Sequence, residues 1–213
     1  MQAAMGIPRT LALCCTLLLG SDIQAQTTSA PSVANPALRQ ELLDRFKQDQ
    51  AIRDEFIKKG VENPDPAVMA RMKATDDANA ERIRAIVRQY GWPGPELVGQ
   101  DGTSAALLLV QHADHALQKE MLPLVEKAYK KGELAGQSYA LLLDRVLIGE
   151  GKPQVYGTQA KRLQEWKERE PVLEPIADEA NVDKRRAEVG LMPLAEYLVI
   201  LKQLYFPQEK GKP

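Results

Sequence analysis

Residues 103–113 read Thr-Ser-Ala-Ala-Leu-Leu-Leu-Val-Gln-His-Ala, and no other stretch downstream of the N-terminal leader constrains the fold as strongly. From Ala105 to Val110 the stretch is apolar on every side and contains neither proline nor charge. A helix that is apolar all round is stable only when other helices surround it. The stretch therefore predicts a central, fully buried helix, and its flanks must supply the helices that cover it.

Two amphipathic helices are expected before this stretch. The first is predicted over 36–59, with Asn35 as its N-cap and Gly60 at its end. The second is predicted over 66–90, and the glycines and prolines of 91–102 then indicate a loop. Both helices have apolar residues at spacings of three and four, so each should pack one face against the central helix.

The segments after the central stretch are also helical in pattern. Helices are expected over 114–131, 135–148, 160–169, 182–189 and 193–205. Pro153 and Gly157 interrupt helix, so 152–159 is predicted as an ordered polar loop. No segment has the alternation of a useful strand. The class is therefore all-α: a single-domain bundle of about six to eight helices over 36–206, followed by a tail over 207–213.

The N-terminus has the pattern of a secretory signal peptide over residues 1–25. Arg9 supplies the positive charge, residues 11–19 form a short apolar core, and Ala25 offers a small residue for cleavage. A linker is predicted over 26–35. These features predict a periplasmic or secreted protein with no membrane span after cleavage. Lipidation at Cys14 or Cys15 and a buried N-terminal helix are the alternatives.

Composition limits the partners. The 213 residues contain 28 basic and 29 acidic side chains, which gives a formal net charge of -1. Such a balance creates no field to attract nucleic acid, and aromatic residues at 5% are too few for base-stacking platforms. We therefore expect no nucleic-acid partner, and a small polar ligand is the partner that the sequence favours.

Polar residues stand where the helical stripes should be apolar. Each occupies a position that the helical period assigns to a buried face: Asp49, Arg53, Asp76, Asn79, His112, Asp144 and Arg186. A charge buried among apolar neighbours must be paired or neutralised, because burying it alone costs several kcal/mol, roughly. Since several helices each turn a polar group inward, these groups are expected to meet one another.

The predicted loop offers neutral hydrogen-bonding groups that charge pairing does not need. Gln154, Tyr156 and Thr158 share one side of an extended segment, and Gln159 follows. We predict that this loop closes over one central cluster, which Arg145 also joins. His112, Asp144 and Tyr156 are the candidate catalytic residues, and the others are candidate ligand-binding residues. The alternative is a non-catalytic envelope module whose polar network is purely structural.

A metal centre has weaker support. His112 and His115 are three residues apart, which would place them on one face of a helix where both could bind a metal ion. Asp114, Asp76 or Asp144 could supply a third ligand. Asp114 is equally suited to cap the next helix, and no phosphate loop, dinucleotide fingerprint or nucleophile elbow is present in the sequence. We therefore predict no metal and no cofactor, and the sequence leaves open whether the protein is an enzyme.

Several separated motifs together resemble a bacterial family catalogued as domain of unknown function 6624. They are Gly91-Trp92-Pro93, Val98-Gly99, Asp101-Gly102, Gln111-His112-Ala113-Asp114, Asp144-Arg145-Val146-Leu147 and the segment 151–159, with Asp49-Gln50…Arg53 and Arg185-Arg186…Val189-Gly190-Leu191. The resemblance spans about residues 38–200. It implies one domain of that extent and no assigned activity.

Overall fold

A computed structural model describes residues 33–60 and 64–206, and the expected signal peptide (1–25), most of the linker and the tail (207–213) lie outside these ranges. Within them the chain forms seven α-helices: α1 (Pro36–Lys59), α2 (Pro66–Tyr90), α3 (Pro95–His112), α4 (His115–Lys130), α5 (Gly136–Gly149), α6 (Val182–Glu188) and α7 (Leu194–Tyr205). Two short 3-10 helices precede α6: η1 (Leu163–Glu165) and η2 (Glu179–Asn181). The prediction of an all-α domain is confirmed.

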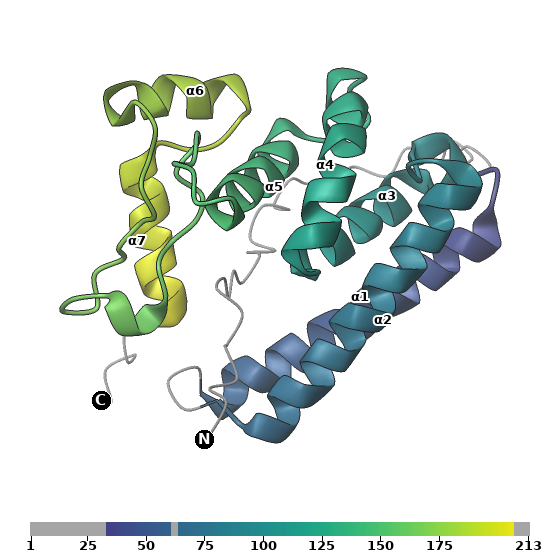
Figure 1. The fold of residues 1–213 in the computed structure, drawn as a ribbon, viewed down its shortest axis with the longest axis horizontal. Coiled ribbons are helices and arrows are strands. Elements are labelled where there is room, and N and C mark those ends of the chain that lie inside the picture. The colour runs from purple at the N-terminus through teal and green to yellow at the C-terminus, as the bar shows by residue number, and fades with distance from the viewer. Residues whose placement is uncertain (1–32, 61–63, 207–213) are drawn as a thin grey trace, which may run out of the picture.

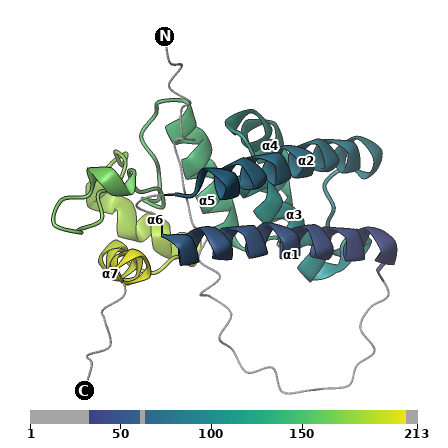
Figure 2. The same ribbon diagram turned by 90° about the horizontal axis from the view of Figure 1, so that it is seen from below.

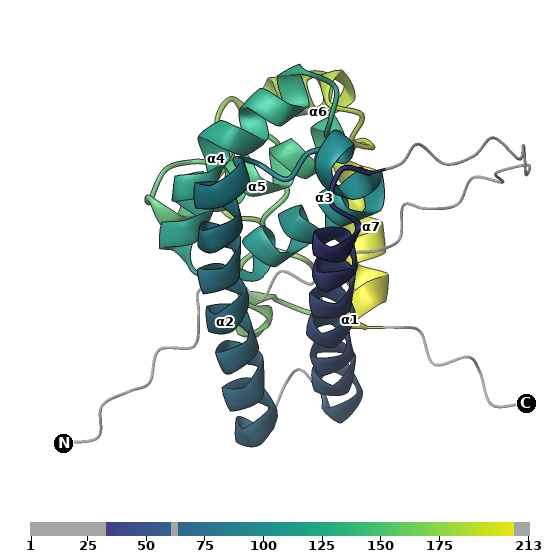
Figure 3. The same cartoon turned by 90° about the vertical axis from the view of Figure 1, so that its right-hand side faces the viewer.

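Helices α1 and α2 form a long antiparallel hairpin (Figure 1). Each begins with a side-chain cap: Asn35 Oδ1 accepts the amide of Leu38 at 3.0 Å, and Asp65 Oδ1 accepts that of Ala67 at 2.8 Å. Ion pairs then cross between the helices, among them Arg82 to Glu41 at 2.7 Å. The halves next to the connection extend beyond α3 and α4 (Figure 3).

Helix α3 begins earlier than the sequence predicts. The expected loop over 91–102 is wrong beyond Gly94, because helical structure starts at Pro95 and continues through a kink at Gly99. Gly99 has φ 74° and ψ 164°, a backbone conformation that favours glycine. Thr103 Oγ1 closes the kink by donating to the carbonyl oxygens of Pro93 at 2.8 Å and Gly99 at 3.0 Å. The glycine therefore joins two helical pieces.

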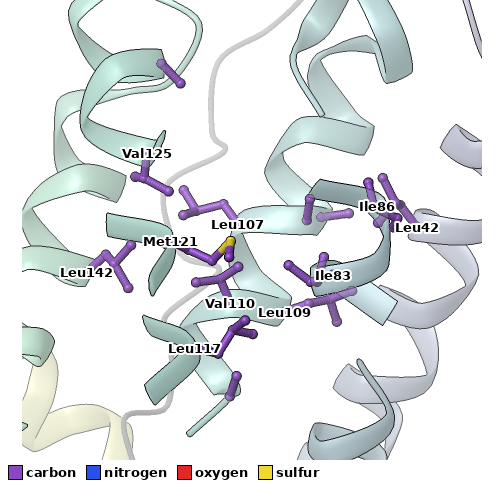
Figure 4. Close-up of a cluster of buried hydrophobic side chains, with 14 of the residues drawn as sticks. Leu42, Ile83, Ile86, Leu107, Leu109, Val110, Leu117, Met121, Val125 and Leu142 are labelled. Atoms are coloured by element: carbon purple, nitrogen blue, oxygen red, sulfur yellow. The ribbon is translucent and has the colours of Figure 1, made fainter. Parts of the chain in front are cut away.

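The second piece of α3 runs along the first half of α1 in the same direction. Arg39 and Asp101 are paired at one end at 2.6 Å, and Asp49 and His112 at the other at 2.9 Å. Between these ends α3 is largely buried, but Ser104 is exposed and Leu108 is partly exposed, so the prediction of a fully buried helix is confirmed only in part. Figure 4 shows its leucines between Ile83, Ile86 and Leu42 on one side and Leu117, Met121, Val125 and Leu142 of α4 and α5 on the other.

The segment between α5 and α6 differs from expectation. The helix predicted over 160–169 is wrong, since only η1 forms there. Backbone hydrogen bonds instead fold the chain back on itself, from Lys161 N to Val172 O at 2.7 Å and from Glu174 N to Gln159 O at 3.1 Å. Pairing amounts to two isolated bridges, and the described residues contain no strand. Helices α6 and α7 follow this segment at one end of the molecule (Figure 2).

A membrane-spanning helix would have to be both long and strongly apolar. None of the helices within 33–60 and 64–206 meets both conditions.

Gly136 offers a test of the packing at the start of α5. A Cβ atom there would lie 2.8 Å from the carbonyl oxygen of Val189 and 3.0 Å from its Cα, so backbone would have to move. We expect Gly136→Ala to lower the free energy of unfolding by about 1–3 kcal/mol, measured in urea. Helix propensity alone favours alanine by up to about 1 kcal/mol. An increase of up to about 1 kcal/mol in the free energy of unfolding of Gly136→Ala would contradict the close contact between Gly136 and Val189.

Candidate functional site

The hydrogen-bonded pair of Asp49 and His112 joins α1 to the end of α3. The side chain of Asp49 has no exposed surface, and that of His112 is 3% exposed. His112 Nδ1 lies 2.9 Å from Asp49 Oδ2 and 3.1 Å from Oδ1. Because a carboxylate can only accept, the proton of a neutral His112 must be on Nδ1.

Two further side chains of α1 complete the shell of Asp49. Arg53 Nη1 donates to Oδ1 at 2.7 Å, and Gln50 Nε2 donates to Oδ2 at 2.8 Å. Arg53 also reaches α2, where its Nη2 donates to Asp76 at 2.9 Å. The result is a continuous chain of bonds from His112 through Asp49 and Arg53 to Asp76. The side chain of Asp76 is 18% exposed, so the chain of bonds ends near solvent.

The other ring nitrogen of His112 has a different environment. Nε2 is buried and has no hydrogen-bond partner among the described residues. Burial lowers the pKa of His112, the hydrogen bond that its Nδ1 donates to Asp49 opposes this shift, and the positive charges of Arg53 and Arg145 lower the pKa further. His112 is therefore neutral at pH 7. Its Nε2 presents an unshared electron pair inside the protein.

The backbone on both sides of His112 is fixed by two neighbouring helices. Gln118 of α4 donates from Nε2 to the carbonyl oxygens of Gln111 at 3.0 Å and Ala113 at 2.9 Å. Arg145 of α5 donates from Nη1 to the same carbonyl of Gln111. Gln118 is not among the site residues predicted from the sequence. It lies on the α4 face of Met121 and Val125, and this is the pattern of a polar residue in an apolar stripe that identified Asp76.

Asp76 has an unusual acidity. Burial raises its pKa to about 6, although Arg53 opposes the shift, and the negative charge of Asp49 adds to it. A carboxyl group with this pKa gains and loses protons near neutral pH. Asp76 can therefore exchange protons at the solvent end of the bonded chain.

A second group of the predicted residues surrounds Asp144 of α5, which is fully buried. Its Oδ1 accepts the amide of Val155 at 2.7 Å, and Oδ2 accepts the amide and hydroxyl of Thr158 at 3.0 and 2.9 Å. The amide of Tyr156 donates to both oxygens. Burial raises the pKa of Asp144, and these hydrogen bonds oppose the shift. Asp144 thus holds the loop to α5.

The remaining loop side chains close the same group. Gln154 bonds the backbone of Gln159 in both directions, at 2.9 and 2.8 Å. Arg186 of α6 donates to the carbonyl oxygen of Tyr156 at 2.7 Å and lies over the ring of Tyr197. Gln159 Nε2 donates to Thr158 Oγ1 at 2.9 Å. These contacts give Gln154, Thr158, Gln159 and Arg186 a structural task, and a ligand-binding role for them stays a prediction.

The hydrogen bonds among these residues form two groups with Arg145 between them, and a single shared site stays a prediction. Asp49, Arg53, Asp76 and His112 form one hydrogen-bonded group, and the loop closes over Asp144 instead. Arg145 stands between the two groups, next to Asp144 in sequence and bonded to the residue before His112. Asn79 belongs to neither, because its Oδ1 accepts from Arg45 at 3.1 Å. Asp49 has its donors on α1 and α3, and Asp144 has its donors on the loop after α5, so two hydrogen-bonded groups form.

Tyr156 takes part in this group through its backbone: its amide donates to Asp144, and its carbonyl oxygen accepts from Arg186. Its hydroxyl is not one of the groups bonded to Asp144. Burial raises its pKa to about 12, and the neighbouring Tyr139 and Tyr129 add to the shift. The hydroxyl is therefore protonated at neutral pH and could only donate a proton or a hydrogen bond. A catalytic role for Tyr156, like one for Asp144, stays a prediction.

His112, Asp114 and His115 have different surroundings in the structure. Asp114 is the N-cap of α4 and accepts the amide of Leu117 at 2.8 Å. The ring of His115 instead packs over Gly149, where a Cβ would meet it at 2.2 Å. In the part of the chain that the structure describes, no three His, Cys, Asp or Glu side chains are grouped to hold a metal ion.

Three comparisons with known proteins complete the description. A family model described as "Family of unknown function (DUF6624)" matches residues 36–210. A search of curated proteins and a search of solved structures each gave no match. The matched range contains all seven helices and both polar groups, and its family is the one that the sequence motifs resemble.

The role of Asp144 can be tested by Asp144→Asn. The new amide nitrogen would face backbone N–H donors that it cannot satisfy, so we expect a loss of about 3 kcal/mol or more in urea unfolding. Asp114→Asn is the matched control, because asparagine caps a helix about as well as aspartate and should change stability little. Equal effects of the two variants would contradict the structural role of Asp144.

The acidity of Asp76 predicts a pH effect. Its pKa is raised on folding, so the stability that it contributes is present below its ordinary pKa near 3.8 and is lost as pH rises through about 6. Asp76→Asn removes this titration and keeps an oxygen for Arg53. Urea unfolding between pH 4 and 7 should show the variant at least as stable as the parent at pH 7, with the advantage vanishing near pH 4. A variant less stable at pH 7 would contradict this.

Proposed function

Because the chain belongs to DUF6624, a family of unknown function, we propose its function from its own residues: it binds a small polar ligand at His112 and acts on it by general-base chemistry. The observation that supports this is the Nε2 atom of His112, which is buried, unprotonated and without a partner among the described residues. Burying a polar atom unsatisfied is costly unless something occupies it in function. A ligand O–H or N–H group would satisfy it.

The bonds around His112 suit a base. When Nε2 takes a proton, the imidazolium that forms is stabilised by the carboxylate of Asp49 at Nδ1, which also fixes the tautomer. Arg53 links that carboxylate to Asp76 and holds it in place, while its own positive charge opposes protonation of His112. In general-base catalysis the ligand's O–H or N–H proton would pass to Nε2. In a hydrolysis, a water molecule would give its proton to Nε2 and then attack the ligand.

The place of action is proposed from the sequence. A signal peptide over residues 1–25 supports export to the periplasm or the medium. Both cysteines lie within that segment, so the exported chain has no thiol that an oxidising compartment could pair. We propose small polar metabolites of the cell envelope as the ligand class.

The alternative function is a structural or interaction module. The group around Asp144 favours it, because every oxygen of that carboxylate is satisfied by the loop and none is left for a ligand. The two readings differ in what they expect of His112. A structural histidine is needed for stability, whereas a site residue is often replaceable without loss of stability.

His112→Gln, with His115→Gln as the matched control, separates the two readings. Asp49 keeps Arg53 and Gln50 in His112→Gln, so we expect stability to change by less than about 1.5 kcal/mol. In a thermal-shift screen of polar envelope metabolites, the parent and His115→Gln should respond to a common ligand and His112→Gln should not. Loss of more than about 3 kcal/mol in His112→Gln, together with no ligand response of the parent, would establish the structural reading.

A further inference from the structure

Residues of α1 and α2 line a groove in the halves of these helices next to their connection. Figure 3 shows that these halves extend beyond α3 and α4. Its volume is about 480 Å³, within the range of small-molecule sites. Seven side chains line it: Gln48, Ala51, Ile52 and Glu55 of α1, with Arg71, Ala74 and Thr75 of α2. None of them belongs to the His112 group, so the groove is a separate feature.

Small residues open the groove on one side of the helix pair. Ala51 and Ala74 line it, whereas Phe56, Val68 and Met72 are buried on other faces of the same two helix halves. The two helices are therefore held together without filling the groove. Ile52 and the two alanines give its lining an apolar part against which an aliphatic group could pack.

The two charged side chains that line the groove, Glu55 and Arg71, have different numbers of ion-pair partners. Glu55 accepts from two cations, Arg71 at 2.6 Å and Lys59 at 3.1 Å. Arg71 has Glu55 as its ion-pair partner, and its side chain is 56% exposed. If a ligand carboxylate took over Arg71, Glu55 would keep Lys59. A ligand cation would instead have to compete with two cations already bound to Glu55.

We propose that this groove binds an amphipathic monocarboxylate, with the carboxylate on Arg71 and the aliphatic body against Ile52, Ala51 and Ala74. Charge complementarity selects the anion, because an incoming carboxylate replaces Glu55 on Arg71 without leaving either group unpaired. The volume and the apolar lining select a small aliphatic body. This site goes beyond the function proposed for His112 and does not depend on it.

Octanoate is a suitable probe, with octanol and octylamine as matched ligands that change only the head group. Binding is followed by NMR through the methyl resonances of Ala51, Ile52, Ala74 and Thr75 during titration. We expect octanoate to shift these methyls in a saturable way at millimolar concentration or below. We expect octanol and octylamine to bind at least about fivefold more weakly, since a charge-assisted bond to Arg71 is lost.

Three variants complete the test. Ala74→Leu fills the groove and should abolish saturable binding, and Arg71→Gln should weaken it about tenfold. Lys73→Gln is the matched control, because it also removes a cation from α2. Lys73 pairs with Asp77 and does not line the groove. It should leave octanoate affinity within about twofold of the parent.

The outcomes are distinct. Absence of saturable shifts with octanoate overturns the site, and equal affinity for octanol or octylamine overturns the assignment of an anionic ligand. Equal weakening by Arg71→Gln and Lys73→Gln would show general attraction of anions and also overturn it. His112→Gln should bind octanoate like the parent, so failure of the His112 proposal and failure of this one are separately visible.

Discussion

The arrangement of the first three helices depends on the burial of one carboxylate, that of Asp49. A charge with no exposed surface costs several kcal/mol, roughly, unless donors surround it. Gln50 and Arg53 donate from its own helix, and His112 at the end of α3 supplies a further donor. Together with the pair of Arg39 and Asp101, this contact marks the length over which α3 runs along α1. Gln118 holds the backbone on both sides of His112.

Much of the fold follows from local chemistry that the sequence displays. Asn35 caps α1 as predicted, α2 begins at the predicted Pro66, and the apolar stretch 105–110 is buried except at Leu108. Prediction fails where tertiary contacts override local pattern. Gly99 was interpreted as part of a loop, yet its positive φ joins two helical pieces, and the charged segment 160–169 folds back on residues 172–174 instead of forming a helix.

In the candidate site, too, the sequence predicts local features but does not predict tertiary contacts. Helical spacing correctly identified inward positions, because burial follows the period of 3.6: the side chains of Asp49, Asn79, His112, Asp144 and Arg186 are buried, and those of Arg53 and Asp76 are partly buried. Spacing gives the face of each residue but not its partner. The pairing of Asp144 with backbone amides of residues 155–158 depends on the path of a loop, and that path has no period from which it could be derived.

The two buried carboxylates differ in the kind of donor that each has, and this difference indicates where chemistry can occur. Three of the donors to Asp144 are backbone amides, which can neither lose a proton in water near neutral pH nor rotate away without unfolding the loop. The donors to Asp49 are side chains, and one of them is an imidazole with a second nitrogen that lacks a partner among the described residues. In such a group of side chains the imidazole can gain a proton, and the carboxylate of Asp49 beside it can stabilise the positive charge that forms. The group around Asp49 is therefore the one to which we assign the proposed proton transfer, and the group around Asp144 is the one that holds the loop to α5.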